Sequence, residues 1–261
     1  MPTLGPRQLD LLATTTDESG RHLNVQLSGS FAYDETQDAP LKTLIGMGSA
    51  SLKLYLTLVL ATRNPPHTLY RGSSSARFAR MLGFDDSLHD DPASAGTRRI
   101  QRALTALADK GFIDREKRPG RLDQITVHAK RPGKGRPHTL PYVTLPLDLW
   151  RLGWIVVMSN PALAVYIALR RHCAGDEDRP LYVTPANRRD GYRLSEDTWA
   201  KGLRDLEALG ILTMIRDNPR DREAVSRERW VYQLHSDKLE QPPPRNTHPR
   251  KARKARSVDS S

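Results

Sequence analysis

The sequence predicts a mainly helical α+β protein in which a unit of three helices and a β-hairpin occurs twice. Three observations lead to this prediction. Apolar residues recur at helical spacing in segments separated by Gly and Pro. Each group of helices is followed by two short segments suited to β-strands. The excess positive charge is confined to two short segments, the first covering the turn of the first predicted hairpin and the linker after it, and the second covering the tail.

The same patterns divide the chain into five parts. We expect residues 1–20 to be loosely ordered and residues 21–33 to form a short strand or hairpin. The five parts are a partly ordered N-terminal extension at 1–48, a first domain at 49–128, a basic linker at 129–141, a second domain at 142–238 and a disordered basic tail at 239–261.

The first domain shows three helical patterns followed by two strands. In the first helix, Leu52, Tyr55, Leu56, Val59 and Leu60 form one apolar stripe, and two prolines follow it. A long acidic loop separates the second and third helices. The predicted segments are the first helix and its exit at 49–69, the second helix at 73–84, the loop at 85–96, the third helix at 97–110 and strands at 112–113 and 122–128.

The second domain repeats this order after a strand-like segment and an apolar cluster at 142–154. Its four tryptophans, Trp150, Trp154, Trp199 and Trp230, are predicted to anchor the core. The predicted segments are a helix at 160–172, a small strand at 181–183, a short helix at 185–191, a long helix at 195–209 and strands at 211–216 and 230–235.

An offset of 99 residues aligns the third helices of the two domains. Both helices end in the pattern L-x-x-L-x-x-x-G, followed by two apolar residues that open a strand. The matching pairs are Ile100 with Trp199, Leu104 with Leu203, Leu107 with Leu206, Gly111 with Gly210, and Phe112-Ile113 with Ile211-Leu212.

This order of helices, glycine and hairpin resembles the winged helix-turn-helix. The resemblance covers residues 49–128 and 142–235 and is most specific over Tyr192–Leu212. That stretch is similar to the recognition-helix region of bacterial transcription regulators and of tandem winged-helix plasmid replication initiators. The resemblance implies double-stranded DNA as the partner, with each third helix in the major groove. The loop at 85–96 departs from the pattern and leaves the contact geometry of the first domain less defined.

Helical phase then selects the side chains that would face DNA. At about 100° per residue, a buried Ile100 or Trp199 places the residues listed here on or beside the outward face, or at the helix start. In the first domain these are Arg98, Arg99, Gln101, Arg102 and Thr105, and in the second they are Ser195, Asp197, Thr198, Lys201 and Arg204. Arg can pair bidentately with guanine, and Lys can reach guanine or phosphate.

The basic turn of the first hairpin and the linker supply further candidate contacts. Such a turn can follow the DNA backbone or place an arginine in the minor groove. The candidates are Arg115, Lys117, Arg118 and Arg121 in the turn and Lys130 and Arg131 in the linker. The second hairpin mixes basic and acidic residues, so we expect a weaker role for it.

The distribution of charge also favours a polyanionic partner. The net charge is +11, yet residues 1–114 carry 12 basic and 12 acidic side chains and residues 139–241 carry 15 of each. Residues 115–138 carry 8 basic and 2 acidic side chains, and residues 242–261 carry 6 and 1. Clusters of this kind focus an attractive field on nucleic acid, although they also occur as solvated flexible segments.

The motifs of common enzymes and cofactor sites are missing from the sequence. Cys173 is the single cysteine, no two histidines are paired at metal-binding spacing, and no phosphate-binding G-x-x-x-x-G-K-[ST] loop occurs. We therefore expect no enzymatic activity, cofactor, metal or evident small-molecule ligand, and a cytoplasmic, nucleoid-associated protein with no membrane contact. The sequence does not choose between a regulator and a replication initiator. It is also compatible with a homodimer. The alternative function is a non-enzymatic winged-helix subunit of a chromosome-organising complex.

Overall fold

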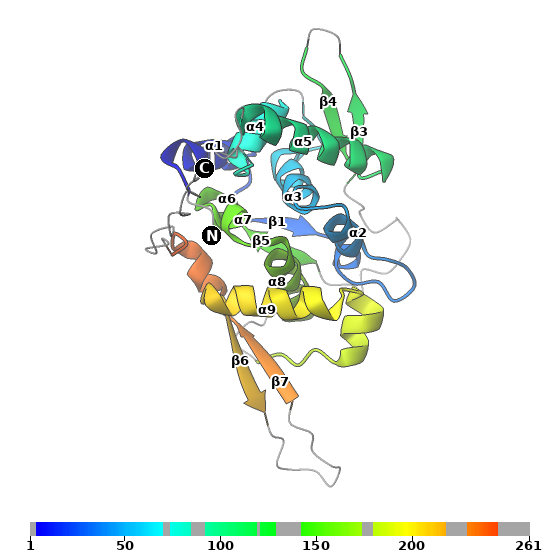
Figure 1. Ribbon diagram of the computed structural model, residues 1–261, viewed down its shortest axis with the longest axis vertical. Coiled ribbons are helices and arrows are strands. Elements are labelled where there is room, and N and C mark those ends of the chain that lie inside the picture. Colours follow the sequence, from blue (N-terminus) through cyan, green and yellow to red (C-terminus); the bar gives the residue numbers. More distant parts are fainter. Residues whose placement is uncertain are drawn as a thin grey trace, which may run out of the picture.

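Helix α3 (Ser51–Ala61) lies in the upper half of the computed structural model (Figure 1), and all residues from Ser51 to Leu60 are buried. The sequence predicts one apolar stripe here, whereas the structure buries every face of the helix. The polar groups are satisfied internally. The Thr57 hydroxyl donates to the Lys53 carbonyl at 2.8 Å and accepts from the Trp150 indole at 3.2 Å.

The structure describes residues 4–69, 74–84, 92–118, 121–128, 142–173, 180–217 and 229–244, which form a mainly helical α+β fold with small antiparallel sheets. The predicted linker at 129–141, with Lys130 and Arg131, lies outside these residues, as do 85–91 of the predicted acidic loop. The rest of that loop is helical, because α5 (Pro92–Asp109) begins before the predicted start at residue 97.

The first repeated unit runs in the order helix, strand, helix, helix, strand, strand. Antiparallel pairing places β4 between the other two strands, in the order β2–β4–β3. The elements are α3, β2 (Thr68–Leu69), α4 (Ser75–Met81), α5, β3 (Ile113–Glu116) and β4 (Gln124–Val127). The Ser74 side chain caps α4 by accepting from the backbone N–H of Arg77.

The second unit follows the same order, with one bridge in place of the first strand. Leu181 and Tyr232 exchange two backbone hydrogen bonds of 2.7 Å, so the bridge lies beside β7 as β2 lies beside β4. The elements are α8 (Asn160–Cys173), the π-turn η2 (Asn187–Tyr192), α9 (Glu196–Ala208), β6 (Leu212–Asp217) and β7 (Arg229–Leu234).

The two units end their long helices in the same way. Gly111 and Gly210 adopt φ values of +69° and +71°, which glycine reaches without the steric cost of a Cβ. The next residue in each unit donates back into the helix, from Phe112 to Leu107 at 2.9 Å and from Ile211 to Leu206 at 3.0 Å. The sequence repeat is therefore also a repeat of backbone structure.

The N-terminal segment is more ordered than the sequence suggests. The expectation that residues 1–20 are loosely ordered is wrong, because α1 (Pro6–Glu18) forms a helix there. This helix packs on α6 (Asp148–Arg151), where Arg151 pairs with Asp17 at 2.8 Å. The segment that was expected to form a strand or hairpin supplies β1 (Asn24–Leu27).

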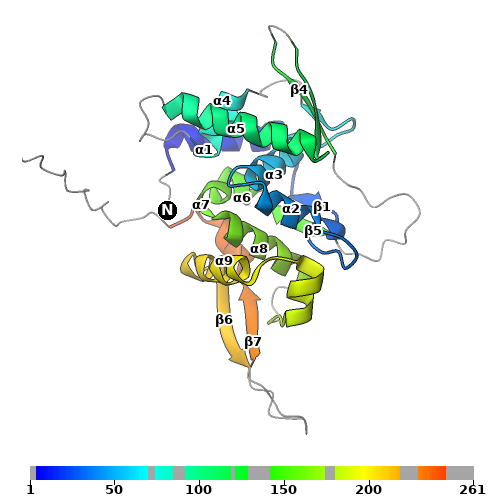
Figure 2. The same ribbon diagram turned by 45° about the vertical axis from the view of Figure 1, so that its right-hand side comes forward.

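Strand β1 joins the N-terminal part of the chain to the region of the second unit. It pairs antiparallel with β5 (Val143–Pro146), with Val25 opposite Leu145. Figures 1 and 2 show this pair between the two units. The remaining elements are η1 (Gly29–Phe31), α2 (Pro40–Gly46), α7 (Trp154–Val157) and η3 (Ser236–Glu240).

A second connection joins the loop after η1 to η2. The backbone N–H of Asp34 donates to the Gly191 carbonyl at 3.1 Å. The ring of Tyr33 lies over Gly191, where an added Cβ atom would overlap the ring. Arg193 donates to the Glu35 carbonyl at 2.9 Å. These contacts, together with β1–β5, attach the N-terminal part of the chain to the second unit.

Three of the four tryptophans are core residues as predicted. Trp150, Trp154 and Trp199 are at most 2% exposed, whereas Trp230 is 45% exposed. The prediction for Trp230 is therefore wrong. Trp230 pairs with Arg216 toward the end of the β6–β7 hairpin, beyond the buried pair Leu212 and Leu234. Among the helices in the described part of the chain, none is long and apolar enough to span a membrane.

Gly202 provides a test of the contact between α8 and α9. A Cβ atom at this position would lie 2.5 Å from the Pro161 carbonyl oxygen and 2.5 Å from Val165 Cγ2, so the helices would have to separate. We expect Gly202→Ala to lower the free energy of unfolding by roughly 1–3 kcal/mol in urea denaturation. The control is Gly46→Ala in α2, where nothing lies within 4 Å. Equal stability of the two variants would contradict the close packing.

Lys53 provides a test of the packing around α3. Its ammonium donates to the Val156 carbonyl at 2.8 Å, and burial lowers its pKa from 10.5 to about 8. Because the unfolded chain binds the proton more tightly, this group destabilises the fold below pH 8 by roughly 3 kcal/mol, and the penalty fades as pH rises toward 10.5.

We expect Lys53→Met to raise the free energy of unfolding at pH 7 by about 1–2 kcal/mol, after the loss of the hydrogen bond. The difference from the wild type should shrink between pH 8 and 10. Parallel pH profiles of the two proteins in urea denaturation would show that burial of the ammonium is not the cause.

Candidate nucleic-acid interface

Helix α5 presents an arginine-rich face to solvent. Ile100, Leu104 and Leu107 are buried, which fixes the rotation of the helix about its axis. The residues selected from helical phase are all exposed, namely Arg98, Arg99, Gln101, Arg102 and Thr105. The outward face of this helix is therefore the one that the sequence predicts.

The three arginines of α5 differ in their surroundings. Arg99 lies over the ring of Phe84, with its guanidinium carbon 5.3 Å from the ring centroid, so it helps to pack α5 against the end of α4. Within the described residues, Arg98 and Arg102 have neither an acidic partner nor a hydrogen bond from their side chains. Their charge is therefore available to a ligand.

Grooves flank Arg98 and Arg102 on both sides. One groove, of about 820 Å³, lies between these residues and the turn at Met47–Ser51, which joins α2 to α3. A second, of about 430 Å³, runs along Gln101 and Thr105 on the other side. The side chains therefore form a positively charged ridge, one helical turn long, between two hollows.

The β3–β4 hairpin beside α5 holds its basic residues in different ways. Arg115 pairs with Asp123 at 2.6 Å, with only 14% and 23% of these side chains exposed, and it reaches the Thr105 hydroxyl at 3.5 Å. Arg115 thus braces the hairpin against α5. Arg118 pairs with Glu116 at 3.1 Å and donates to Gln124. Lys117 and Arg121 are exposed.

Helix α9 uses two of its candidate residues to begin the helix. The Ser195 hydroxyl accepts from the Thr198 backbone N–H at 3.2 Å and donates to the Thr198 hydroxyl at 2.8 Å. Asp197 is exposed in the first turn, where a negative charge is favoured by the helix dipole. These three positions therefore have a structural reason for their residue types.

The two basic candidates on α9 are close to an acid. Lys201 pairs with Asp205 at 2.9 Å, and Arg204 is exposed next to it. Burial alone would raise the pKa of Asp205, but hydrogen bonds from Ser159 and Lys201, with the charges of Lys201 and Arg204, hold it below its ordinary value. The acid stays ionised and offsets much of the local positive charge.

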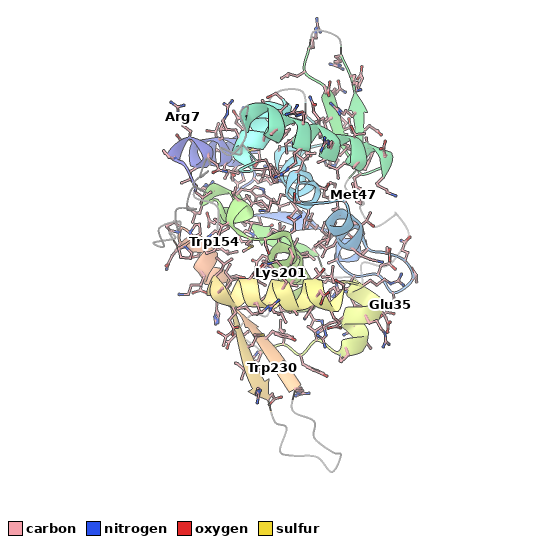
Figure 3. The ribbon with its side chains drawn as sticks, viewed as in Figure 1. Arg7, Glu35, Met47, Trp154, Lys201 and Trp230 are labelled. Carbon is pink, nitrogen blue, oxygen red and sulfur yellow. The ribbon has the colours of Figure 1, made fainter. Side chains whose placement is uncertain are left out.

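The two equivalent helices therefore have opposite charge. Helix α5 carries three arginines and one aspartate, a net of +2, whereas α9 carries two basic and four acidic residues, a net of −2. Figure 1 shows each helix beside its own hairpin, with the hairpins extending from opposite ends of the molecule. Figure 3 labels Lys201 on α9 and Trp230 on the adjacent hairpin.

Sequence reasoning missed two features of these surfaces. The turn at Met47–Ser51 forms one wall of the larger groove, and its only signal in the sequence is a cluster of small residues. Asp123, the partner of Arg115, was not selected because the cross-strand geometry that brings them together depends on the turn. Comparisons with protein-family models, curated proteins and solved structures find no match.

Proposed function

We propose that this chain is a sequence-specific double-stranded DNA-binding protein with two winged-helix units, acting as a transcription regulator or as a plasmid or phage replication initiator. The order of elements supports the winged-helix assignment. Both units run helix, strand or bridge, helix, helix, strand, strand, and in both the last strand lies in the middle of the sheet. Under this assignment α5 and α9 are the recognition helices.

The observation that carries the proposal is the pair Arg98 and Arg102 on α5. Two exposed guanidinium groups one helical turn apart, without acidic partners in the described residues, suit bidentate contacts to guanines in the major groove. The grooves beside them leave room for the DNA backbone. Lys117 and Arg121 on the neighbouring hairpin would then contact phosphates.

A second candidate function concerns the surface of α9. Its net charge of −2 and the engagement of Lys201 by Asp205 favour a protein partner over DNA at this helix. In that case the second unit would be a non-enzymatic interaction module, as in winged-helix subunits of chromosome-organising complexes, or the contact that forms a homodimer. DNA binding by α5 is compatible with either role.

The arginine pair gives the direct test of DNA binding. We expect Arg98→Ala/Arg102→Ala to weaken binding to a duplex, selected from a random library by the wild-type protein, by at least roughly 30-fold in a gel-shift titration. The matched control, Arg7→Ala/Lys238→Ala, removes two exposed charges from α1 and η3. Equal affinities of the two double variants would remove α5 from the interface.

The same duplex distinguishes the two candidate roles of α9. Because Asp205 already engages Lys201, we expect Lys201→Ala/Arg204→Ala to weaken duplex binding by only about 3- to 10-fold. A loss as large as that of the α5 variant would establish two equivalent recognition helices. No loss would favour a protein partner for α9, which size-exclusion chromatography with light scattering can examine for the homodimer.

A further inference from the structure

Exposed apolar side chains gather on the β6–β7 hairpin and on the adjacent segment 180–182. We refer to Tyr182, Ile215, Arg216, Arg229 and Trp230 as the hairpin surface. The six large apolar side chains most exposed in the described part of the chain include Tyr182 at 36%, Ile215 at 37% and Trp230 at 45%. Ile215 and Trp230 lie on the two strands of the hairpin, and Tyr182 lies on the segment that bridges to β7. Exposed apolar side chains gathered in one region in this way indicate a binding surface.

Each aromatic ring of the hairpin surface is stacked with an arginine. The guanidinium carbon of Arg216 lies 5.0 Å from the Trp230 ring centroid, and that of Arg229 lies 4.9 Å from the Tyr182 centroid. Arg216 and Trp230 are direct cross-strand neighbours, and Arg229 immediately precedes Trp230 in β7. Because side chains alternate along a strand, the two aromatic–arginine pairs lie on opposite faces of the hairpin.

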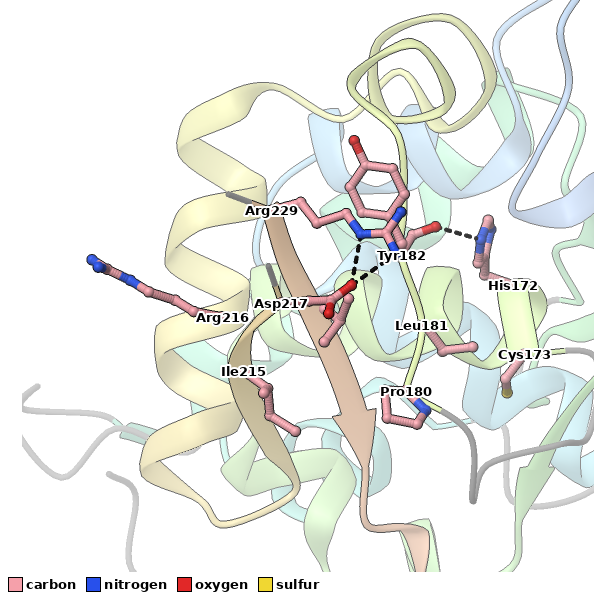
Figure 4. A pocket seen from close by; sticks show the side chains of 10 residues that line it. His172, Cys173, Pro180, Leu181, Tyr182, Ile215, Arg216, Asp217 and Arg229 are labelled. Atoms are coloured by element: carbon pink, nitrogen blue, oxygen red, sulfur yellow. Dashed lines mark hydrogen bonds and ion pairs between the residues drawn. The ribbon is translucent and has the colours of Figure 1, made fainter. Parts of the chain in front are cut away.

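The Tyr182 face opens into a cavity of about 580 Å³ between the segment 180–182 and the hairpin (Figure 4). Its walls are held in place by polar contacts. Asp217 binds Arg229 through two contacts of 2.8 Å, and the Tyr182 carbonyl meets the His172 ring at 3.1 Å. Arg216 also lines the rim of this cavity, and in Figure 4 its guanidinium points away from the other labelled side chains. The surface is therefore built before any ligand binds.

The chemistry of this surface suits unpaired nucleobases. Aromatic rings stack on the flat faces of bases, and adjacent arginines contact the phosphates between them. Stacking between neighbouring bases covers these faces inside a duplex, whereas single-stranded nucleic acid can present them. We propose that the hairpin surface binds single-stranded DNA, stacking bases on Trp230 and in the cavity beside Tyr182. This site is separate from the duplex contacts proposed for α5.

Tryptophan fluorescence provides a specific readout of this site. All four tryptophans lie in the described residues, and three are at most 2% exposed, so a stacking base would quench Trp230 alone. We expect a thymine 20-mer to quench the emission of the wild-type protein at low salt. Trp230→Ala should bind a fluorescently labelled 20-mer at least roughly 5-fold more weakly, with Tyr182→Ala weakened similarly and Trp230→Phe much less.

Tyr142→Ala is the matched control, because Tyr142 is an aromatic residue with 48% exposure next to β5. It should bind the 20-mer as the wild type does, and all variants should keep the wild-type melting temperature. Unquenched emission at saturating 20-mer, or equal affinities of Trp230→Ala and Tyr142→Ala, would overturn the proposal.

The duplex assay separates this proposal from the proposed function. We expect Trp230→Ala to change binding to the selected duplex by less than 2-fold. If the chain binds the duplex but not the 20-mer, the single-strand site alone is wrong. If 20-mer binding depends on Arg98 and Arg102 rather than on Trp230, single strands bind at α5 and the site is likewise wrong. Binding to neither form of DNA would overturn both proposals.

Discussion

The burial of α3 and of the middle of α8 on all sides determines which surfaces of this protein can meet a ligand. Every residue of α3 from Ser51 to Leu60 is buried, as is every residue of α8 from Ala162 to Leu169. Because these helices are buried on all sides, they form the core of the units. The other long helix of each unit, α5 or α9, is then the one that faces solvent. This packing also buries the ammonium group of Lys53, which donates a hydrogen bond to the Val156 carbonyl. The exposed faces of α5 and α9 therefore follow from what lies beneath them.

Local pattern was enough to predict the repeated units. The spacing of Ile100, Leu104 and Leu107 gave the buried face of α5, and Gly111 gave its end, because both depend on residues within one or two turns. The pairing of β1 with β5 was not predictable in this way. Strands at residues 24–27 and 143–146 meet only after the core has formed, and no periodicity encodes such a partner. The error at Trp230 has a related cause, since alternation marks the face of a strand but not where the core beneath it ends.

For the candidate interface, the sequence identified which basic and polar side chains could contact DNA. The structure then showed which of them already pair with other residues of the protein. Arg98 and Arg115 are equivalent as basic residues in the sequence. Only the fold shows that Arg115 is committed to Asp123 while Arg98 faces solvent. Likewise, Ser195 and Thr198 were selected as contacts and prove to close the first turn of α9. Charge counted along the chain therefore overstates the charge that is available to a ligand.

The N-terminal part of the chain contacts both units and so fixes the distance between them. The N-terminal part of the chain is attached to the second unit through β1–β5 and through Tyr33 on Gly191. Its helices α1 and α2 pack on α3 of the first unit. With two attachment points, one unit cannot swing freely about the other, so the distance between α5 and α9 is a property of the fold. The fold therefore presents α5 and α9 to a partner at one fixed separation. Any partner that touches both helices must offer its two contact points at that spacing, or must itself bend to supply them.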